Sequence, residues 1–178
     1  MQNLMQDITI IGGGVMGLFT AYYASEFVEN ITILEKETVG SDNQKAASFS
    51  YTRSIRNDYL DSQYAQLAYE ARRLWLDFQQ KAETPFLIEC GCLNLAKKSI
   101  TPDFTTTYAV QSHNILRQLH LKAEEFTHET LQQRFPQFDV DLARLDVEAG
   151  LLYVPEVTRT LLAALRERKV RILYQSAN

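Results

Sequence analysis

The sequence predicts an α/β protein in which a βαβ unit opens the chain and part of an α+β domain interrupts it. A short apolar strand is followed by a glycine-rich turn, a helix-like run and a second strand that ends at Glu35. Residues 40–154 then contain helices and short strands that look antiparallel. A final helix and strand return the chain, and we expect this strand to rejoin the first sheet.

The glycine turn is the most specific local pattern. Gly12 permits a tight turn out of the strand, Gly14 lets a pyrophosphate approach the backbone, and Gly17 lets the helix lie close to the strand. The N–H groups at the start of that helix favour phosphate. Glu35 follows Gly14 by 21 residues, where a carboxylate can accept hydrogen bonds from ribose hydroxyls. The pattern predicts a Rossmann-like dinucleotide site; the alternative is a glycine-rich turn in an unrelated α/β protein.

Periodicity and capping residues define the other elements. The strongest helix begins at Asp61, with apolar residues such as Leu67, Leu74 and Phe78 at steps of three and four. Thr127 precedes a short helix that Pro136 stops. The strands are expected at 6–11, 31–35, 86–89, 92–96, 122–126, 145–154 and 170–174, and the helices at 14–28, 61–82, 105–120, 128–134 and 157–169. Residues 36–50 are expected to form a loop.

Bulk properties exclude several classes of protein. The length of 178 residues fits about one domain, and 46% hydrophobic with 22% charged residues is typical of a globular protein. The net charge of −4 gives no attraction to nucleic acid or to an anionic membrane. We expect no signal peptide, no membrane span and a cytoplasmic location. Cys90 and Cys92 with three scattered histidines predict no metal site.

Several further segments together resemble a known family. The chain is similar to FAD-dependent oxidoreductases of the D-amino-acid oxidase type, especially the monomeric sarcosine oxidase and N-methyl-tryptophan oxidase branch. The segments that carry the resemblance are Ile10-Ile-Gly-Gly-Gly-Val-Met-Gly17, Leu34-Glu35, Ala47-Ser48, Thr52-Arg-Ser-Ile-Arg56, Leu74-Trp75, Gly91-Cys-Leu, Arg134-Phe-Pro136 and Glu148-Ala-Gly-Leu-Leu-Tyr153.

The resemblance implies FAD as the nucleotide and a Rossmann-like FAD-binding βαβ unit interrupted by part of a substrate domain. Residues 1–48 and 155–178 would form the FAD-binding part, and residues 49–154 would form the partial substrate domain. The implied cofactor-binding residues are Gly12, Gly14, Val15, Met16, Gly17, Glu35, Lys36, Ala47 and Ser48.

Two arginines would serve the reaction. The resemblance places Arg53 beside the isoalloxazine and Arg56 against a substrate carboxylate, while Asp58 and Tyr59 follow in the same loop. A guanidinium can hold a carboxylate with two parallel hydrogen bonds and keeps its charge when partly desolvated. The alternative for both arginines is a pair of solvated loop charges.

The chain departs from the family in two ways. Phe49-Ser50-Tyr51 stands where the branch often carries histidine, which leaves the flavin environment and the substrate open. The family is roughly twice as long, so the rest of the substrate domain, an oxygen-activating lysine and any flavin-attachment cysteine are missing here. Cys90 and Cys92 do not match that cysteine, so covalent flavin is not expected. We expect an N-terminal portion: a truncated reading frame, one part of a split gene, or an artificially shortened chain.

The resulting functional hypothesis is oxidation of the C–N bond of a small amino acid or N-methyl amino acid, with hydride passing to FAD. One alternative is a catalytically incomplete FAD-binding fragment that needs a C-terminal half on another chain. Another is an FAD-dependent 2-hydroxy-acid or glycerol-phosphate dehydrogenase, since fold does not decide chemistry. An NAD-dependent enzyme is disfavoured by the wider resemblance.

Overall fold

The chain divides into two compact units in a computed structural model that describes residues 7–39, 47 and 50–174. One unit comprises Met1–Arg53 with Tyr153–Asn178, and the other comprises Ser54–Leu152. The first unit is therefore assembled from both ends of the chain, and the second from its middle.

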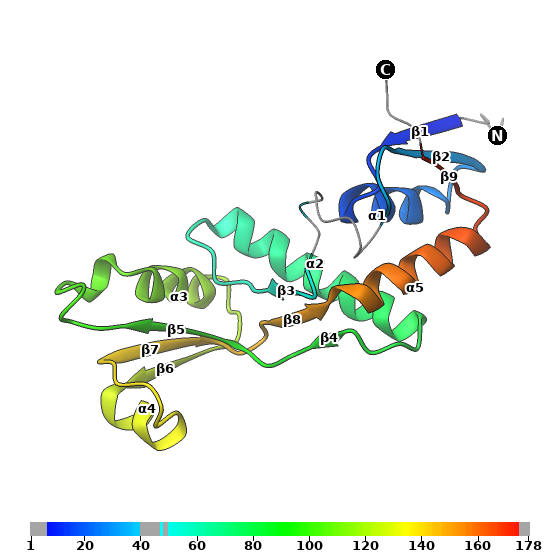
Figure 1. Ribbon diagram of the computed structural model, residues 1–178. Helices are drawn as coiled ribbons and strands as arrows, with labels where there is room; N and C mark the ends of the chain where they lie inside the picture. Colours follow the sequence, from blue (N-terminus) through cyan, green and yellow to red (C-terminus); the bar gives the residue numbers. More distant parts are fainter. Residues whose placement is uncertain (1–6, 40–46, 48–49, 175–178) are drawn as a thin grey trace. The chain divides into compact units, whose positions relative to one another are not determined.

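A three-stranded parallel sheet organises the first unit (Figure 1). Its order is β1 (Asp7–Ile11), β2 (Asn30–Glu35) and β9 (Arg171–Tyr174). The central strand carries Ile31 and Ile33, which are almost fully buried, as expected where helices cover a parallel sheet. The prediction that the last strand rejoins the first sheet is confirmed by its pairing with β2.

Helices α1 (Val15–Ala24) and α5 (Val154–Glu167) lie against one another in this unit. Arg168 fastens the end of α5 to α1, because its Nη1 donates to Tyr22 O at 2.6 Å and its guanidinium lies 3.9 Å from the Tyr22 ring centre. The expected extension of the first helix to residue 28 was wrong. The helix ends at Ala24, and an acidic side chain at Glu26 is unfavourable at the negative end of a helix dipole.

An antiparallel sheet with two helices forms much of the second unit. Its order is β5 (Cys92–Ala96), β7 (Leu142–Asp146) and β6 (Ala123–Thr127). Helix α3 (Tyr108–Gln118) contacts all three strands, and α4 (His128–Arg134) contacts β6 and β7. The core between α4 and this sheet consists of Phe126, Leu131, Ala143 and Leu145.

The remaining elements of the chain are α2 (Ser62–Lys81), the short 3₁₀ helix η1 (Phe104–Thr106) and a third sheet. In that sheet β8 (Gly150–Tyr153) lies between β3 (Thr52–Ile55) and β4 (Leu87–Ile88). Strand β3 was not predicted, because four residues with three charged or polar side chains give little periodicity.

The expected strand over residues 145–154 was also wrong, since the segment forms β7, a turn and β8. The turn is closed by Ala149 N, which donates to Asp146 O at 3.4 Å, and Ala149 O accepts from Gly91 N at 2.8 Å. A side chain on Gly150 would place its Cβ 2.1 Å from Ile88 O, so the glycine permits the close pairing of β8 with β4.

Two helix starts differ from the expected positions. Helix α3 starts at Tyr108 instead of residue 105, because Phe104–Thr106 turn as η1 and Thr107 then caps the helix. Helix α5 starts at Val154, three residues early, with a proline in its first turn, where a missing N–H is tolerated. Within the described residues, no helix has the length and apolarity needed to cross a membrane.

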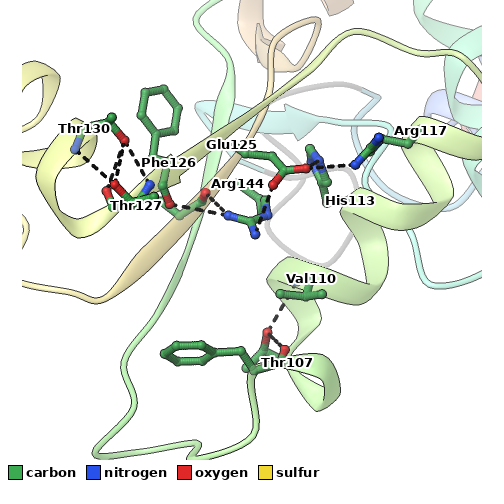
Figure 2. A network of polar contacts seen from close by, with 11 residues as sticks. Thr107, Val110, His113, Arg117, Glu125, Phe126, Thr127, Thr130 and Arg144 are labelled. Atoms are coloured by element: carbon green, nitrogen blue, oxygen red, sulfur yellow. Dashed lines mark hydrogen bonds and ion pairs between the residues drawn. The ribbon is translucent and has the colours of Figure 1, made fainter.

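A charged network joins α3 to the antiparallel sheet (Figure 2). The side chain of His113 is only 4% exposed, and its Nε2 lies 2.9 Å from Glu125 Oε1. Arg117 and Arg144 also contact the Glu125 carboxylate. The Nδ1 atom of His113 is buried and has no hydrogen-bond partner among the described residues. Burial lowers the pKa of His113 despite the neighbouring Glu125, so the neutral ring is favoured.

We predict that stability falls as the pH is lowered below about 7 because of His113. The pKa of a free histidine is near 6.5, and the folded value lies lower, so the unfolded chain binds more protons between the two values. The variant His113→Gln keeps a donor to Glu125 without titrating and should reduce the slope of unfolding free energy against pH, by at most about 1.4 kcal/mol per pH unit.

Urea unfolding between pH 5.5 and 8 measures this slope. The exposed neighbour Asn114 on the same helix supplies a matched control, Asn114→Gln, which should keep the slope of the unmodified chain. Equal slopes for His113→Gln and the unmodified chain would contradict the prediction.

Candidate functional site

The turn after β1 has the backbone that the glycine pattern predicts. Gly12 adopts a φ of +101°, which favours glycine, and its N–H donates to Leu34 O of β2 at 2.8 Å. Gly14 is the N-cap residue of α1 and has extended backbone angles. The first turn of α1 contains no acidic residue, and no side chain caps its start. The positive end of the helix dipole is therefore not offset by a carboxylate on its own first turn.

Gly17 allows α1 to touch this turn. A Cβ at this position would lie 1.9 Å from Gly12 O and 3.4 Å from Ile10 Cγ2. The first of these atoms belongs to the backbone and cannot rotate away. The missing side chain is thus a steric requirement of the observed helix position.

Glu35, the last residue of β2, lies against the same turn. Its Oε2 accepts from Gly13 N at 2.6 Å, and its Oε1 accepts from Glu37 N at 3.0 Å. Burial alone would raise the pKa of Glu35, but the backbone hydrogen bonds from Gly13, Glu37 and Lys36 outweigh it and the pKa is lowered. Each carboxylate oxygen keeps a second lone pair with which it can accept a hydroxyl.

The other predicted cofactor residues are less distinctive. Val15 and Met16 form the first turn of α1, and Met16 is 79% exposed. Lys36 is exposed directly after β2. Ala47 O accepts from Arg53 Nη2 at 2.6 Å in an exposed hydrogen bond. Ser48 lies outside the described residues.

Arg56 belongs to the second unit and is held by its neighbours there. Its side chain is 36% exposed, and its Nη1 donates to Asp58 Oδ1 at 3.3 Å and to Tyr108 OH at 2.8 Å. Its guanidinium carbon lies 5.2 Å from the ring centre of Tyr59 and 5.5 Å from that of Tyr108. Burial lowers the pKa of Arg56, but Asp58 and the two tyrosines raise it more, so the charge is retained.

A cluster of buried polar residues, whose long-range contacts the sequence did not predict, lies next to Arg56. Asp58 is 1% exposed and accepts from Asn94 Nδ2 of β5, and the Tyr108 hydroxyl donates to the Asp58 carbonyl. Asp146 of β7, also 1% exposed, accepts from Asn57 N at 2.6 Å. Burial raises the pKa of both Asp58 and Asp146, and hydrogen bonds oppose the rise. The local signals of this cluster were Asp58, which follows Arg56 in the same loop, and Asn94, a polar residue within an apolar strand.

The arrangement in the first unit suits an anionic ligand that also carries hydroxyl groups. A helix start without an acidic first turn, a glycine turn without side chains and an adjacent carboxylate occur together. These are the groups that hold the pyrophosphate and ribose of a dinucleotide. No group of three metal-ligating side chains is present in the described ranges.

Residues 7–177 match the family described as FAD dependent oxidoreductase, also called DAO. The chain belongs to this family. The resemblance read from the sequence is thereby confirmed, and the cofactor of this family is FAD. The glycine turn, the start of α1 and Glu35 fit the phosphates and ribose of that cofactor.

Relatives of this DAO chain include sarcosine oxidases. Peroxisomal sarcosine oxidase from Homo sapiens is 28% identical over 93% of the chain, and sarcosine oxidase subunit beta from Rhizobium meliloti (strain 1021) is 32% identical over 82%. N-methyl-L-tryptophan oxidase from Yersinia pestis (strain Pestoides F) is 24% identical over 94%. The chain spans only 41%, 34% and 44% of these three proteins, respectively.

Solved structures confirm the fold of this DAO chain. L-proline dehydrogenase from P. horikoshii superimposes with a TM-score of 0.79 at 20% identity, over 97% of this chain and 45% of that protein. Glycine oxidase from Geobacillus kaustophilus gives a TM-score of 0.76 at 18% identity, over 94% of this chain and 46% of that protein. At these identities the likeness shows the α/β fold alone.

We predict that Gly17→Ala destabilises the chain. The added Cβ meets a backbone oxygen, so α1 must shift, at a cost of about 1–3 kcal/mol. Denaturant unfolding monitored by circular dichroism measures the change. The exposed position Thr20 on the same helix provides a control, because Thr20→Ala should alter stability by no more than about 0.5 kcal/mol. Equal stability of the two variants would show that α1 does not need the close approach.

Proposed function

We propose that this DAO chain forms the FAD-binding part and a portion of the substrate-binding part of an oxidoreductase. The reaction would oxidise the C–N bond of a small amino acid or N-methyl amino acid. The observation that carries the proposal is the contact between Glu35 and Gly13, which joins the carboxylate of β2 to the turn that precedes α1. The names of the relatives, which refer to sarcosine and N-methyl-L-tryptophan, support the substrate class.

The cofactor would be held mainly by the backbone of the first unit. Gly12, Gly14 and Gly17 would leave room for the pyrophosphate, with Val15 and Met16 supplying the first helical turn. Glu35 would accept from ribose hydroxyls, and Lys36, Ala47 and Ser48 would line the adjacent cofactor surface. FAD, when bound, supplies the two-electron acceptor. The residues of this chain bind and orient the reactants.

The substrate would be oriented by arginine. Arg56 would hold its carboxylate, and Arg53 would lie beside the isoalloxazine. A fixed carboxylate restricts where the carbon that bears nitrogen can lie, and such positioning is an established source of rate. In this proposal residues 1–48 and 155–178 serve the cofactor, and residues 49–154 serve the substrate.

A second candidate is an FAD-binding portion that needs further chain to act. It is favoured by β1, which pairs with β2 alone among the described strands and carries Ile11 with 78% of its surface exposed. An apolar open edge invites another strand. We propose that a C-terminal portion, on the same or a separate chain, supplies it. The cytoplasmic location stays a prediction.

We predict that the purified chain retains FAD and that Glu35→Gln weakens this binding about 10- to 100-fold. Glutamine keeps only one acceptor oxygen and loses the charge that strengthens hydrogen bonds to hydroxyls. The measurement is the flavin absorbance that co-elutes with the chain after incubation with FAD. Glu29, an exposed acid at the end of the preceding loop, gives the charge-matched control Glu29→Gln, which should bind FAD as the unmodified chain does.

Two outcomes would count against this assignment. An unmodified chain that retains no flavin at high FAD concentration would refute cofactor binding by this chain. Equal affinities for Glu35→Gln and Glu29→Gln would refute the role of Glu35. Because Glu35 also accepts from Gly13 and Glu37, thermal unfolding of the cofactor-free variants must establish that each is folded at the assay temperature.

We predict that Arg56→Lys raises the KM for carboxylate substrates about 100-fold in the complete flavoprotein that contains this chain. Lysine keeps the positive charge beside Asp58 but cannot form two parallel hydrogen bonds. Steady-state kinetics with sarcosine and N-methyl-L-tryptophan measure the effect. Arg73→Gln, at an exposed arginine of α2, should leave the kinetics unchanged. An unaltered KM in Arg56→Lys would exclude Arg56 as the carboxylate ligand.

A further inference from the structure

One nitrogen of the Arg56 guanidinium is fully engaged within the second unit. Nη1 has two hydrogens and two acceptors, Asp58 Oδ1 at 3.3 Å and Tyr108 OH at 2.8 Å. Nε and Nη2 of Arg56 have no hydrogen-bond partner among the described residues. The side of the guanidinium formed by Nε–H and one Nη2–H is the side that can bind a carboxylate with two parallel hydrogen bonds.

Aromatic rings also restrict the guanidinium. The carbon Cζ of Arg56 lies 5.2 Å from the centre of the Tyr59 ring and 5.5 Å from that of Tyr108. Both distances are within the range in which a cation is attracted to a ring. The hydrogen bonds therefore fix one corner of the group, and the two rings limit the remaining motion of its plane.

Asp58 and Tyr108, which accept from Arg56, are themselves held in place by further hydrogen bonds. Asp58 is 1% exposed, and its Oδ2 accepts from Asn94 Nδ2 of β5. The Tyr108 hydroxyl accepts from Arg56 and donates to the Asp58 carbonyl. Both hydroxyl functions of Tyr108 are thus used, and burial raises the pKa of Tyr108, which keeps its proton in place.

We propose that Asp58 and Tyr108 are positioning residues that hold Arg56 with its Nε–Nη2 side directed to a substrate carboxylate. This inference rests on the proposed function, in which Arg56 is the carboxylate ligand. A simpler role for the cluster is to fasten residues 56–58 to the antiparallel sheet. The two roles differ in outcome, because only positioning links Asp58 and Tyr108 to the affinity and orientation of a carboxylate.

Conservative variants separate these roles. Asp58→Asn keeps the shape and can still accept from Asn94, but its amide then faces Arg56 with a donor. Tyr108→Phe keeps the ring and removes the hydroxyl. The control is Glu125→Gln, which removes a carboxylate from a different arginine cluster of the same unit (Figure 2) and does not touch Arg56.

The first readout uses the 178-residue chain alone. Slow rotation of a held guanidinium gives separate ¹⁵N–¹H NMR signals for Nη1 and Nη2, and the loss of these signals in Arg56→Lys assigns them. We expect separate signals in the unmodified chain and in Glu125→Gln, and merged signals in Asp58→Asn and Tyr108→Phe. Signals that stay separate in both of these variants would overturn the proposal.

The second readout uses the complete flavoprotein with sarcosine and with dimethylamine, which is sarcosine without its carboxylate. We expect Asp58→Asn and Tyr108→Phe to raise the KM for sarcosine about 10-fold, the effect of losing one well-placed hydrogen bond, without changing the rate with dimethylamine. A fall in stability with unchanged kinetics for sarcosine would show that the cluster only fastens the chain.

Failure of this proposal can be told apart from failure of the proposed function. Unchanged kinetics in Asp58→Asn and Tyr108→Phe, with a large effect in Arg56→Lys, would refute positioning and leave Arg56 as the ligand. An unchanged KM for sarcosine in Arg56→Lys would refute both the positioning role of Asp58 and Tyr108 and the role of Arg56 as the carboxylate ligand. If the unmodified protein oxidises neither sarcosine nor any other small amino acid or N-methyl amino acid, the proposed function fails, and the NMR readout on the chain still decides whether Asp58 and Tyr108 hold Arg56.

Discussion

The first unit depends on the contact between α1 and the turn after β1, where Gly17 has no side chain to keep Gly12 O away. This contact fixes the direction of α1 relative to β1, and hence the place to which its first-turn N–H groups point. Gly12 pairs with Leu34 of β2 through its N–H, so β2 ends beside the same turn. Glu35, the last residue of β2, is thereby placed where its side chain accepts a hydrogen bond from Gly13 N. One steric constraint thus brings the helix start, the turn and the carboxylate together.

This part of the molecule could be predicted because its contacts are local in the sequence or repeat with a fixed spacing. Glycine is required at Gly12 by a φ of +101° and at Gly17 by the closeness of Gly12 O, and both requirements leave a visible residue type. Glu35 follows at the distance set by one helix and one strand. The residues that determine the geometry of this turn therefore all lie within the first 35 positions of the sequence.

The surroundings of Arg56 could not be predicted in the same way. Tyr108 is 52 positions from Arg56, and Asp146 is 89 positions from Asn57, so these contacts join segments that lie far apart in the sequence. The segment over 145–154 shows the same limit. Its apolar residues suggest one strand, but the turn before Gly150 is held by a hydrogen bond that Gly91 N, from a distant part of the chain, donates to Ala149 O.

The two proposed binding functions, one in each unit, would therefore use different physical means. Phosphate binding by the glycine turn would use backbone N–H groups and a helix dipole, which depend little on side-chain identity once the glycines are present. Carboxylate binding by Arg56 would use side chains held by other side chains, and Asp58 offsets much of the charge that Arg56 would otherwise present. An arginine paired in this way attracts anions weakly from a distance, because the field of the pair falls off faster than that of a lone charge. Its advantage lies in orientation, since a guanidinium with one nitrogen fixed and two rings beside it loses little further freedom when a carboxylate binds. The affinity of Arg56 for a carboxylate should accordingly depend more on how its neighbouring side chains orient it than on the net charge of the second unit.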